Sequence, residues 1–123
     1  MRLKNIEMEG MIIQLSKHLD RVDKIGYAAA RNTRILKSAS IEYFERRDQL
    51  ISEMGEDELD SDGRPTGRKG LKVSSPEFAK FVEAIEEYAM IEHDVELFRI
   101  PFSEAEGKIS GNELLETYWM FED

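Results

Sequence analysis

The segment EDELDSDG, residues 56–63, has the residue types and spacing that best suit a bound ion. Four of its residues take the first, third, fifth and sixth places of an EF-hand calcium loop: Glu58, Asp60, Asp62 and Gly63. The twelfth place holds Lys69, where a bidentate glutamate normally completes the oxygen cage. A cation cannot coordinate calcium, so we expect a solvated acidic turn and no metal site.

The next stretch, GRPTGRKG, resembles a phosphate-binding loop only in composition. Gly63, Gly67 and Gly70 lack the P-loop spacing. No buried apolar strand precedes them, and no Ser or Thr follows Lys69. The residues therefore favour a flexible turn.

The two histidines, His18 and His93, fall on different expected elements, and neither belongs to an HExxH-type pair. Glu92 and Asp94 flank His93, but adjacent side chains at a helix end point in different directions, so we expect a surface cluster there. The chain has no Cys, which excludes thiolate zinc sites and thiol nucleophiles. No serine lies in a nucleophile elbow. We therefore expect no enzyme activity, no metal and no cofactor.

The length of 123 residues and the 41% of hydrophobic residues fit a single domain over residues 1–123 with one core. The net charge of −9 is uneven, because residues 73–123 hold three Lys or Arg and thirteen Asp or Glu. An acidic half repels phosphate groups, so nucleic-acid binding is disfavoured. Glu7 and Glu9 interrupt the first apolar run, and no stretch approaches about 18 apolar residues, so we expect no export signal and no membrane contact.

Apolar residues recur at steps of three and four in several stretches, which is the period of a helix. The spacing predicts a first helix over residues 6–19, with Asn5 as its N-cap. It predicts a second helix of nearly thirty residues, which begins at residues 21–24 and ends at Met54, before Gly55.

Two capping boxes predict where the later helices begin. Ser74 and Glu77 precede a third helix whose apolar stripe consists of Phe78, Phe81, Val82, Ile85 and Ala89. Ser110 and Glu113 open a last helix, whose apolar residues are Leu114, Leu115, Tyr118 and Phe121.

The segments between the helices favour other structures. Residues 2–4 predict a short edge strand, and residues 94–102, DVELFRIPF, predict an extended segment that Pro101 ends. Residues 56–75 are rich in glycine and charge and predict a flexible charged loop, with a small hairpin that turns at Asp62 and Gly63.

Taken together, the elements predict a mainly α (α+β) fold. Because the second and third helices both carry an apolar stripe, we expect them to form a long antiparallel helical hairpin. A short N-terminal helix, a short extended segment and a C-terminal helix complete the fold.

The aromatic residues Tyr118, Trp119 and Phe121 are the candidate interaction surface. A helix at a chain end buries one face only, and these rings occupy more than one. The rings that the core leaves uncovered are expected to contact a partner.

The order of segments resembles a set of short, uncharacterised proteins that phages and prophages of Gram-positive bacteria encode. The matching segments cover nearly the whole chain and include no diagnostic catalytic motif: RLKNIEM with IIQLSKHLD, YFERRDQLISEMGE, the DG turn, PEFAKFVEAIEE, DVELFRIPFSE and ELLETYW.

This resemblance implies a phage-encoded accessory or structural protein that acts through protein–protein contact in tail or head–tail assembly. Its partner is then a phage structural protein, a host protein or a second copy of itself, in the bacterial host cytoplasm or in the virion. The alternative is an acidic regulator or decoy that binds a host nucleic-acid-binding protein, with the acidic C-terminal half as a phosphate-like surface.

Overall fold

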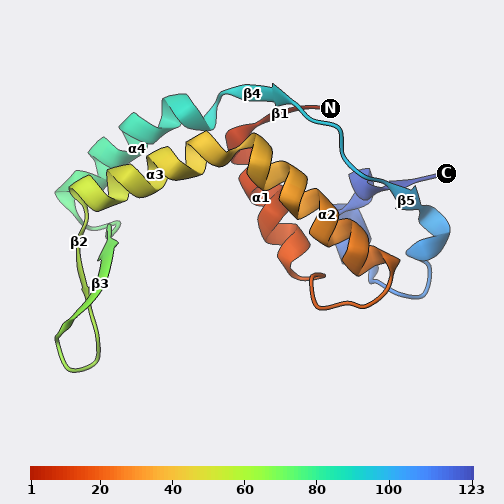
Figure 1. Ribbon diagram of the computed structural model, residues 1–123, viewed down its shortest axis with the longest axis horizontal. Helices are drawn as coiled ribbons and strands as arrows, with labels where there is room; N and C mark the ends of the chain where they lie inside the picture. Colours follow the sequence, from red (N-terminus) through yellow and green to blue (C-terminus); the bar gives the residue numbers. More distant parts are fainter. The chain divides into compact units, whose positions relative to one another are not determined.

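The computed structural model describes residues 1–123, which form two compact units (Figure 1). Unit 1 consists of Met1–Ser40 and Glu92–Asp123, and unit 2 is Ile41–Ile91. The buried apolar residues form two separate clusters, one in each unit, where we expected one core.

Five α-helices and three small sheets confirm the mainly helical α+β class. None of the helices is both long and apolar enough to cross a membrane. The single domain stays a prediction.

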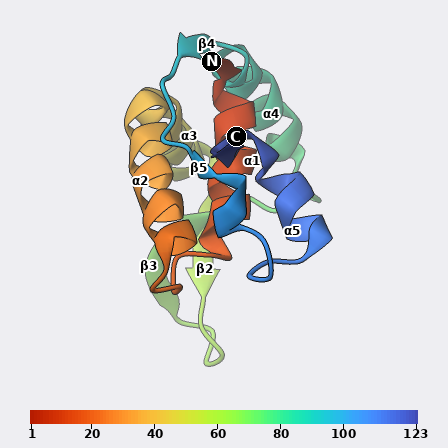
Figure 2. The same cartoon turned by 90° about the vertical axis from the view of Figure 1, so that its right-hand side faces the viewer.

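Unit 1 contains three helices and four short strands. They are β1 (Arg2–Lys4), α1 (Asn5–Ser16), α2 (Lys24–Ala39), β4 (Glu92–Asp94), β5 (Ile100–Pro101), α5 (Gly111–Glu116) and β6 (Phe121–Glu122). β1 pairs antiparallel with β4, and β5 pairs parallel with β6. Figure 2 shows α1 with α2 on one side and α5 on the other. Two 3-10 turns, Phe102–Glu104 and Tyr118–Met120, lie beside β5 and β6.

The core of unit 1 joins residues from both ends of the chain. Met8 and Leu15 of α1, Leu36 of α2 and Met120 near the C-terminus are all fully buried. Each buried aliphatic side chain of this size contributes about 1.5–3 kcal/mol. The short C-terminal elements are therefore held mainly by packing on α1 and α2.

Unit 2 is a pair of helices with a β-hairpin between them in sequence. Its elements are α3 (Ile41–Met54), β2 (Glu56–Leu59), β3 (Pro65–Gly70) and α4 (Pro76–Ala89). α3 and α4 pack through a small cluster of buried residues: Tyr43, Leu50, Ile85 and Ala89. β2 pairs antiparallel with β3, so the small hairpin expected within residues 56–75 is present. Gly63, at its turn, has φ of +77°, which glycine adopts without steric cost.

The predicted second helix is divided at Ser40, so the long helical hairpin is not confirmed. The buried Ser40 hydroxyl donates to the carbonyl of Leu36 at 2.6 Å, and Ser40 has φ −106° and ψ 15°, outside the helical range. α2 packs on α1, and only α3 packs on α4. The predicted stop before Gly55 agrees with the end of α3 at Met54.

Several predicted helix ends are also corrected. Lys4, in extended conformation, is the N-cap of α1, and Asn5 is its first helical residue. α1 ends at Ser16, three residues earlier than expected. Ser75, not Ser74, caps α4, because its hydroxyl accepts a hydrogen bond from the backbone N–H of Glu77 at 3.2 Å. Pro76 follows at the first helical position, where its missing N–H costs nothing.

The extended segment predicted at residues 94–102 forms strand pairs only at its two ends. Residues 95–99 lie between β4 and β5 without a neighbouring strand. Val95 donates its backbone N–H to the carbonyl of Met1 at 2.8 Å. The predicted extended segment is therefore assigned as strand only in β4 and β5, and Val95 finds its hydrogen-bond partner at Met1 of unit 1.

Candidate protein-binding surface

The last helix, α5, begins at the capping box predicted from Ser110 and Glu113. The Ser110 hydroxyl accepts from the backbone N–H of Glu113 at 3.1 Å, and the Glu113 carboxylate accepts from the backbone N–H of Ser110 at 3.0 Å. The hydrogen bond from the Ser110 backbone N–H to this carboxylate is the largest cause that lowers the pKa of Glu113. The carboxylate thus stays charged at the helix N-terminus, where a negative charge is stabilising.

The helix is shorter than predicted and ends at Glu116. The hydroxyl of Thr117 donates to the carbonyl of Glu113 at 2.7 Å, and Thr117 has φ −117° and ψ 21°. The chain then continues as a 3-10 turn and β6, so the aromatic residues after Thr117 do not follow a helical stripe.

Because the helix ends there, the three aromatic residues of the predicted surface differ in how far they are buried. Phe121 is only 4% exposed and belongs to the core of unit 1. Trp119 is half-buried and packs against that core. Tyr118 is 57% exposed. The structure therefore presents one of the three rings to solvent and uses the other two for packing.

Tyr118 packs against Phe102, and Leu115 of α5 is a second exposed apolar side chain in this part of the chain. The ring of Tyr118 lies 5.1 Å from that of Phe102, which in turn stacks on Phe121 at 5.9 Å. Leu115, three residues before Tyr118, is 73% exposed. An exposed aromatic ring is thus held in place by two rings that connect it to the core.

An open, mostly apolar hollow of about 490 Å³ adjoins Phe102. Its apolar walls come from Phe102, Ala105, Ile109 and Leu114, with Gly107 and Gly111 at its edge. Gly107 has φ of +74°, and a Cβ there would touch nothing within 4 Å. We define the C-terminal surface as this hollow together with Leu115 and Tyr118. The sequence pattern does not reveal the hollow, because its walls come from residues without a shared period.

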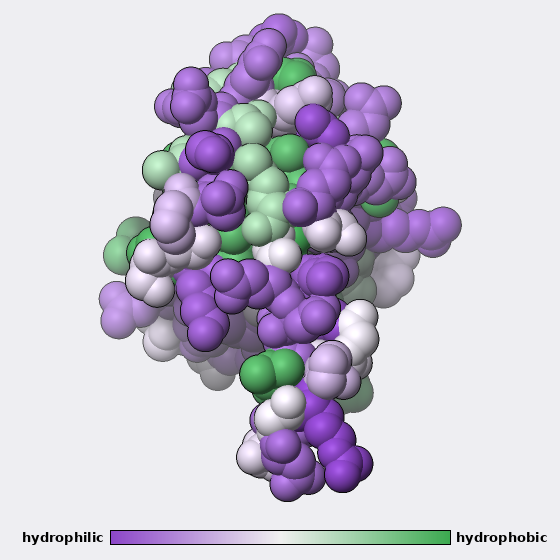
Figure 3. Space-filling model, turned by 90° about the vertical axis from the view of Figure 1, so that its left-hand side faces the viewer, coloured by the Kyte–Doolittle hydropathy of each residue, from purple (hydrophilic) through white to green (hydrophobic).

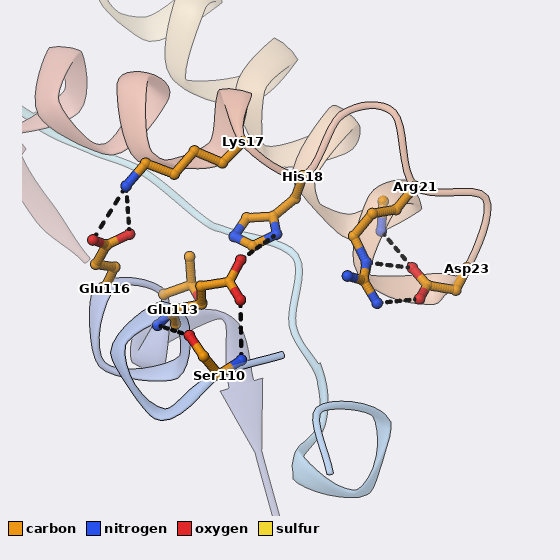
Figure 4. Close-up of polar contacts among 9 residues, drawn as sticks. Lys17, His18, Arg21, Asp23, Ser110, Glu113 and Glu116 are labelled. Carbon is orange, nitrogen blue, oxygen red and sulfur yellow. Dashed lines mark hydrogen bonds and ion pairs between the residues drawn. The ribbon is translucent and has the colours of Figure 1, made fainter. Parts of the chain in front are cut away.

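Two contacts connect α5 to the residues that follow α1 (Figure 4). Lys17 places its Nζ atom 3.0 Å from an Oε atom of Glu116. His18, only 1% exposed, places Nδ1 3.8 Å from an Oε atom of Glu113. Both carboxylates belong to α5, so α5 is fixed from the side of α1. His18 was expected in no site and is a buried residue of unit 1, while His93 lies in β4 opposite Leu3.

The turn that follows His18 is closed by Arg21 and Asp23 (Figure 4). The guanidinium of Arg21 donates to both carboxylate oxygens of Asp23, at 2.6 and 3.1 Å. Asp23 is the N-cap of α2, and its carboxylate also accepts from the backbone N–H of Gly26 at 3.2 Å. The hydrogen bonds from Arg21 are the largest cause that lowers the pKa of Asp23 to about 2. An aspartate directly before a helical pattern is a sequence signal for an N-cap, and Asp23 before α2 was not among the predicted caps.

The residues of the calcium-like segment lie on the β-hairpin of unit 2. Asp60 uses one carboxylate oxygen to accept from the backbone N–H groups of Asp62 and Arg64, both at 2.9 Å. Nowhere in the chain do three His, Cys, Asp or Glu side chains gather in a group that could hold a metal ion. Asp60 of this segment therefore stabilises the turn.

Comparison of the chain with protein-family models, with curated proteins and with solved structures found no match.

Proposed function

We propose that the protein is a phage-encoded accessory or structural protein that binds another protein through the C-terminal surface. The observation that carries this proposal is the exposure of Leu115 (73%) and Tyr118 (57%), together with the contact of the Tyr118 ring with Phe102, which lines an apolar hollow. Tyrosine is among the residues that most often dominate binding energy, because it combines a large apolar area with a polar group.

The surroundings of Tyr118 suit an anchor that is rigid before binding. Its ring is braced by Phe102, and α5 is braced by the contacts of Glu113 and Glu116 with the end of α1. A side chain that is already ordered loses less conformational entropy when a partner covers it. The hollow offers room for apolar side chains of that partner.

The proposal that a phage or prophage encodes this protein rests on the resemblance of its segment order to that of short phage proteins. In that setting the partner is a component of the tail or of the head–tail junction, and the complex forms in the bacterial host cytoplasm or in the virion.

The test is affinity capture with the tagged full-length chain from phage-infected cells, followed by mass spectrometry. We expect virion proteins to be captured, and we expect Leu115→Ser and Tyr118→Ala each to reduce the captured amount at least tenfold, which corresponds to about 1.4 kcal/mol. The matched control is Val22→Ser, which removes a fully exposed apolar side chain elsewhere in unit 1.

Two outcomes contradict the proposal. Capture of host nucleases or polymerases in place of virion proteins supports the acidic decoy. Equal capture by wild type, Leu115→Ser and Tyr118→Ala removes the C-terminal surface from consideration.

A further inference from the structure

The hairpin of unit 2 leaves both of its outer strand edges unpaired. β2 and β3 pair with each other and with no other strand. Every residue of β2 is exposed, and so is every residue of β3 before Gly70. Outer strand edges carry backbone N–H and C=O groups that can pair with another strand, and a two-stranded hairpin alone is only marginally stable.

The two edges carry charges of opposite sign. The acidic residues on the β2 side are Glu56, Asp57, Glu58 and Asp60, and the basic residues on the β3 side are Arg64, Arg68 and Lys69. Figure 3 shows the hairpin at the lower end of the view, covered mostly by hydrophilic residues. Inside the hairpin, Lys69 Nζ lies 2.7 Å from Asp57 Oδ1, so an acidic strand beside a basic strand is already the observed arrangement.

Charge on edge strands commonly prevents association, and here it prevents two of the three possible edge pairings between identical hairpins. Pairing of β2 with a second β2 places carboxylates opposite carboxylates, and pairing of β3 with a second β3 places cations opposite cations. Only pairing of β2 with the β3 of another copy repeats the acidic–basic match found within one hairpin.

We propose that the β2 edge of one copy pairs with the β3 edge of a second copy of this chain. The backbone hydrogen bonds of the added strand supply the attraction, and the charges select the partner edge. Such contact uses different surfaces on the two copies, so it continues head to tail into a ring or a filament.

The base of the hairpin lies close to the end of α3, which contacts β3. A Cβ at Gly55 would lie 2.7 Å from the carbonyl oxygen of Gly70, and a Cβ at Gly70 would lie 2.7 Å from a carboxylate oxygen of Glu58. A side chain larger than glycine therefore has no room at either position. Along the same base, a hollow of about 510 Å³ beside Leu59 and Leu71 leaves room for side chains of an added strand.

The first test is sedimentation velocity of the full chain over a wide concentration range, up to about 1 mM because the contact is small. We expect the average mass to rise with concentration at low salt. Exposed charge pairs are screened by salt, so we expect the association to weaken at about 1 M salt, where the screening length is about 3 Å. A monomer at every concentration overturns the proposal.

The second test reverses one edge at a time. Within the strands themselves, Arg68→Glu with Lys69→Glu gives β3 two negative charges, and Glu56→Lys with Asp57→Lys gives β2 a net charge of +1, because Glu58 remains. Each double variant alone should lose self-association at least tenfold, and an equimolar mixture should recover it. Stronger association of either double variant alone means that like edges pair, and it overturns the proposal.

A variant with all four substitutions covers the case in which the double variants fail to form the hairpin. It exchanges the signs of the net charges within β2 and β3, so an acidic strand still lies beside a basic one, and we expect it to fold and associate as the wild type does. A folded but monomeric fourfold variant contradicts the proposal. Tyr118→Ala should leave this association unchanged, which separates it from binding through the C-terminal surface.

Discussion

The side chain of Asn32 holds the backbone of Phe98 by two hydrogen bonds. Its Nδ2 donates to the carbonyl of Phe98 at 2.8 Å, and the N–H of Phe98 donates to its Oδ1 at 2.7 Å. Asn32 lies on α2 and is fully buried. Phe98 lies in residues 95–99, which have no neighbouring strand, so one amide side chain supplies the pair of hydrogen bonds that a strand would otherwise supply.

We predict that Asn32→Ala destabilises the protein by roughly 2–4 kcal/mol, because it leaves the N–H and the carbonyl of Phe98 without these partners. Urea unfolding followed by circular dichroism measures the loss. Asn112→Ala, at an exposed position of α5, is the matched control and should change stability by less than about 0.5 kcal/mol. Equal effects of the two substitutions would show that the Asn32 contact carries little stability.

Gly26 and Gly10 should respond to alanine in opposite ways. A Cβ at Gly26 would overlap the backbone oxygen of Arg21 and lie 2.8 Å from its carbonyl carbon, whereas a Cβ at Gly10 would meet nothing within 4 Å. We expect Gly26→Ala to lower the free energy of unfolding by roughly 2–3 kcal/mol, because the backbone at Arg21 must move to make room for the Cβ. Gly10→Ala should stabilise α1 by about 0.5–1 kcal/mol, because glycine loses more conformational freedom in a helix. Thermal unfolding of both variants checks the opposite signs.

The low pKa of Asp23 makes the free energy of unfolding depend on pH. The pKa is about 2 in the folded protein and 3.8 for an ordinary aspartate, so the contribution of Asp23 is present above about pH 4 and is lost as pH falls toward 2. Asp23→Asn removes the charge and leaves a capable N-cap residue. We expect this variant to be less stable than the wild type at neutral pH, with the difference shrinking between pH 4 and pH 2. Urea unfolding at a series of pH values gives the comparison, and a constant difference would contradict it.

Trp119 and Tyr118 should differ in stability although they are adjacent. Trp119 packs against the core of unit 1, so Trp119→Ala should cost roughly 2–3 kcal/mol, somewhat less than truncation of a fully buried Trp. Tyr118 is mostly exposed, so Tyr118→Ala should cost less than about 1 kcal/mol. Chemical unfolding separates the two, and a larger loss for Tyr118 would mean that its contact with Phe102 belongs to the core. The expected difference makes Tyr118 the sharper probe of partner binding.

Features that depend on neighbouring residues could be predicted from the sequence. Ser110 and Glu113 form their capping box, Gly55 follows the end of α3, and the hairpin turns near Asp62 and Gly63. Each of these is decided within a few residues, by a side chain that reaches a nearby backbone group or by the freedom of glycine.

The positions of the candidate site residues were decided by contacts between distant parts of the chain. The break at Ser40 depends on a buried hydroxyl that bonds to Leu36, and the periodicity of apolar residues continues through it. Phe121 is buried in the core because α5 ends at Glu116 and β6 pairs with β5. In this pairing Phe121 lies opposite Ile100, which is buried too. The spacing of apolar residues within one segment cannot predict such a strand pair, because the partner strand β5 lies about twenty residues earlier in the chain.

The sequence by itself determined the helical class, the charge of each segment and the local caps and turns, since these follow from residue type and short-range spacing. Only the tertiary structure decided that His18 is buried against α5, that Tyr118 alone of the three rings faces solvent, and that a hollow adjoins Phe102. The physical reason is that burial depends on which segments pack together, and many different packings satisfy the same pattern of apolar residues.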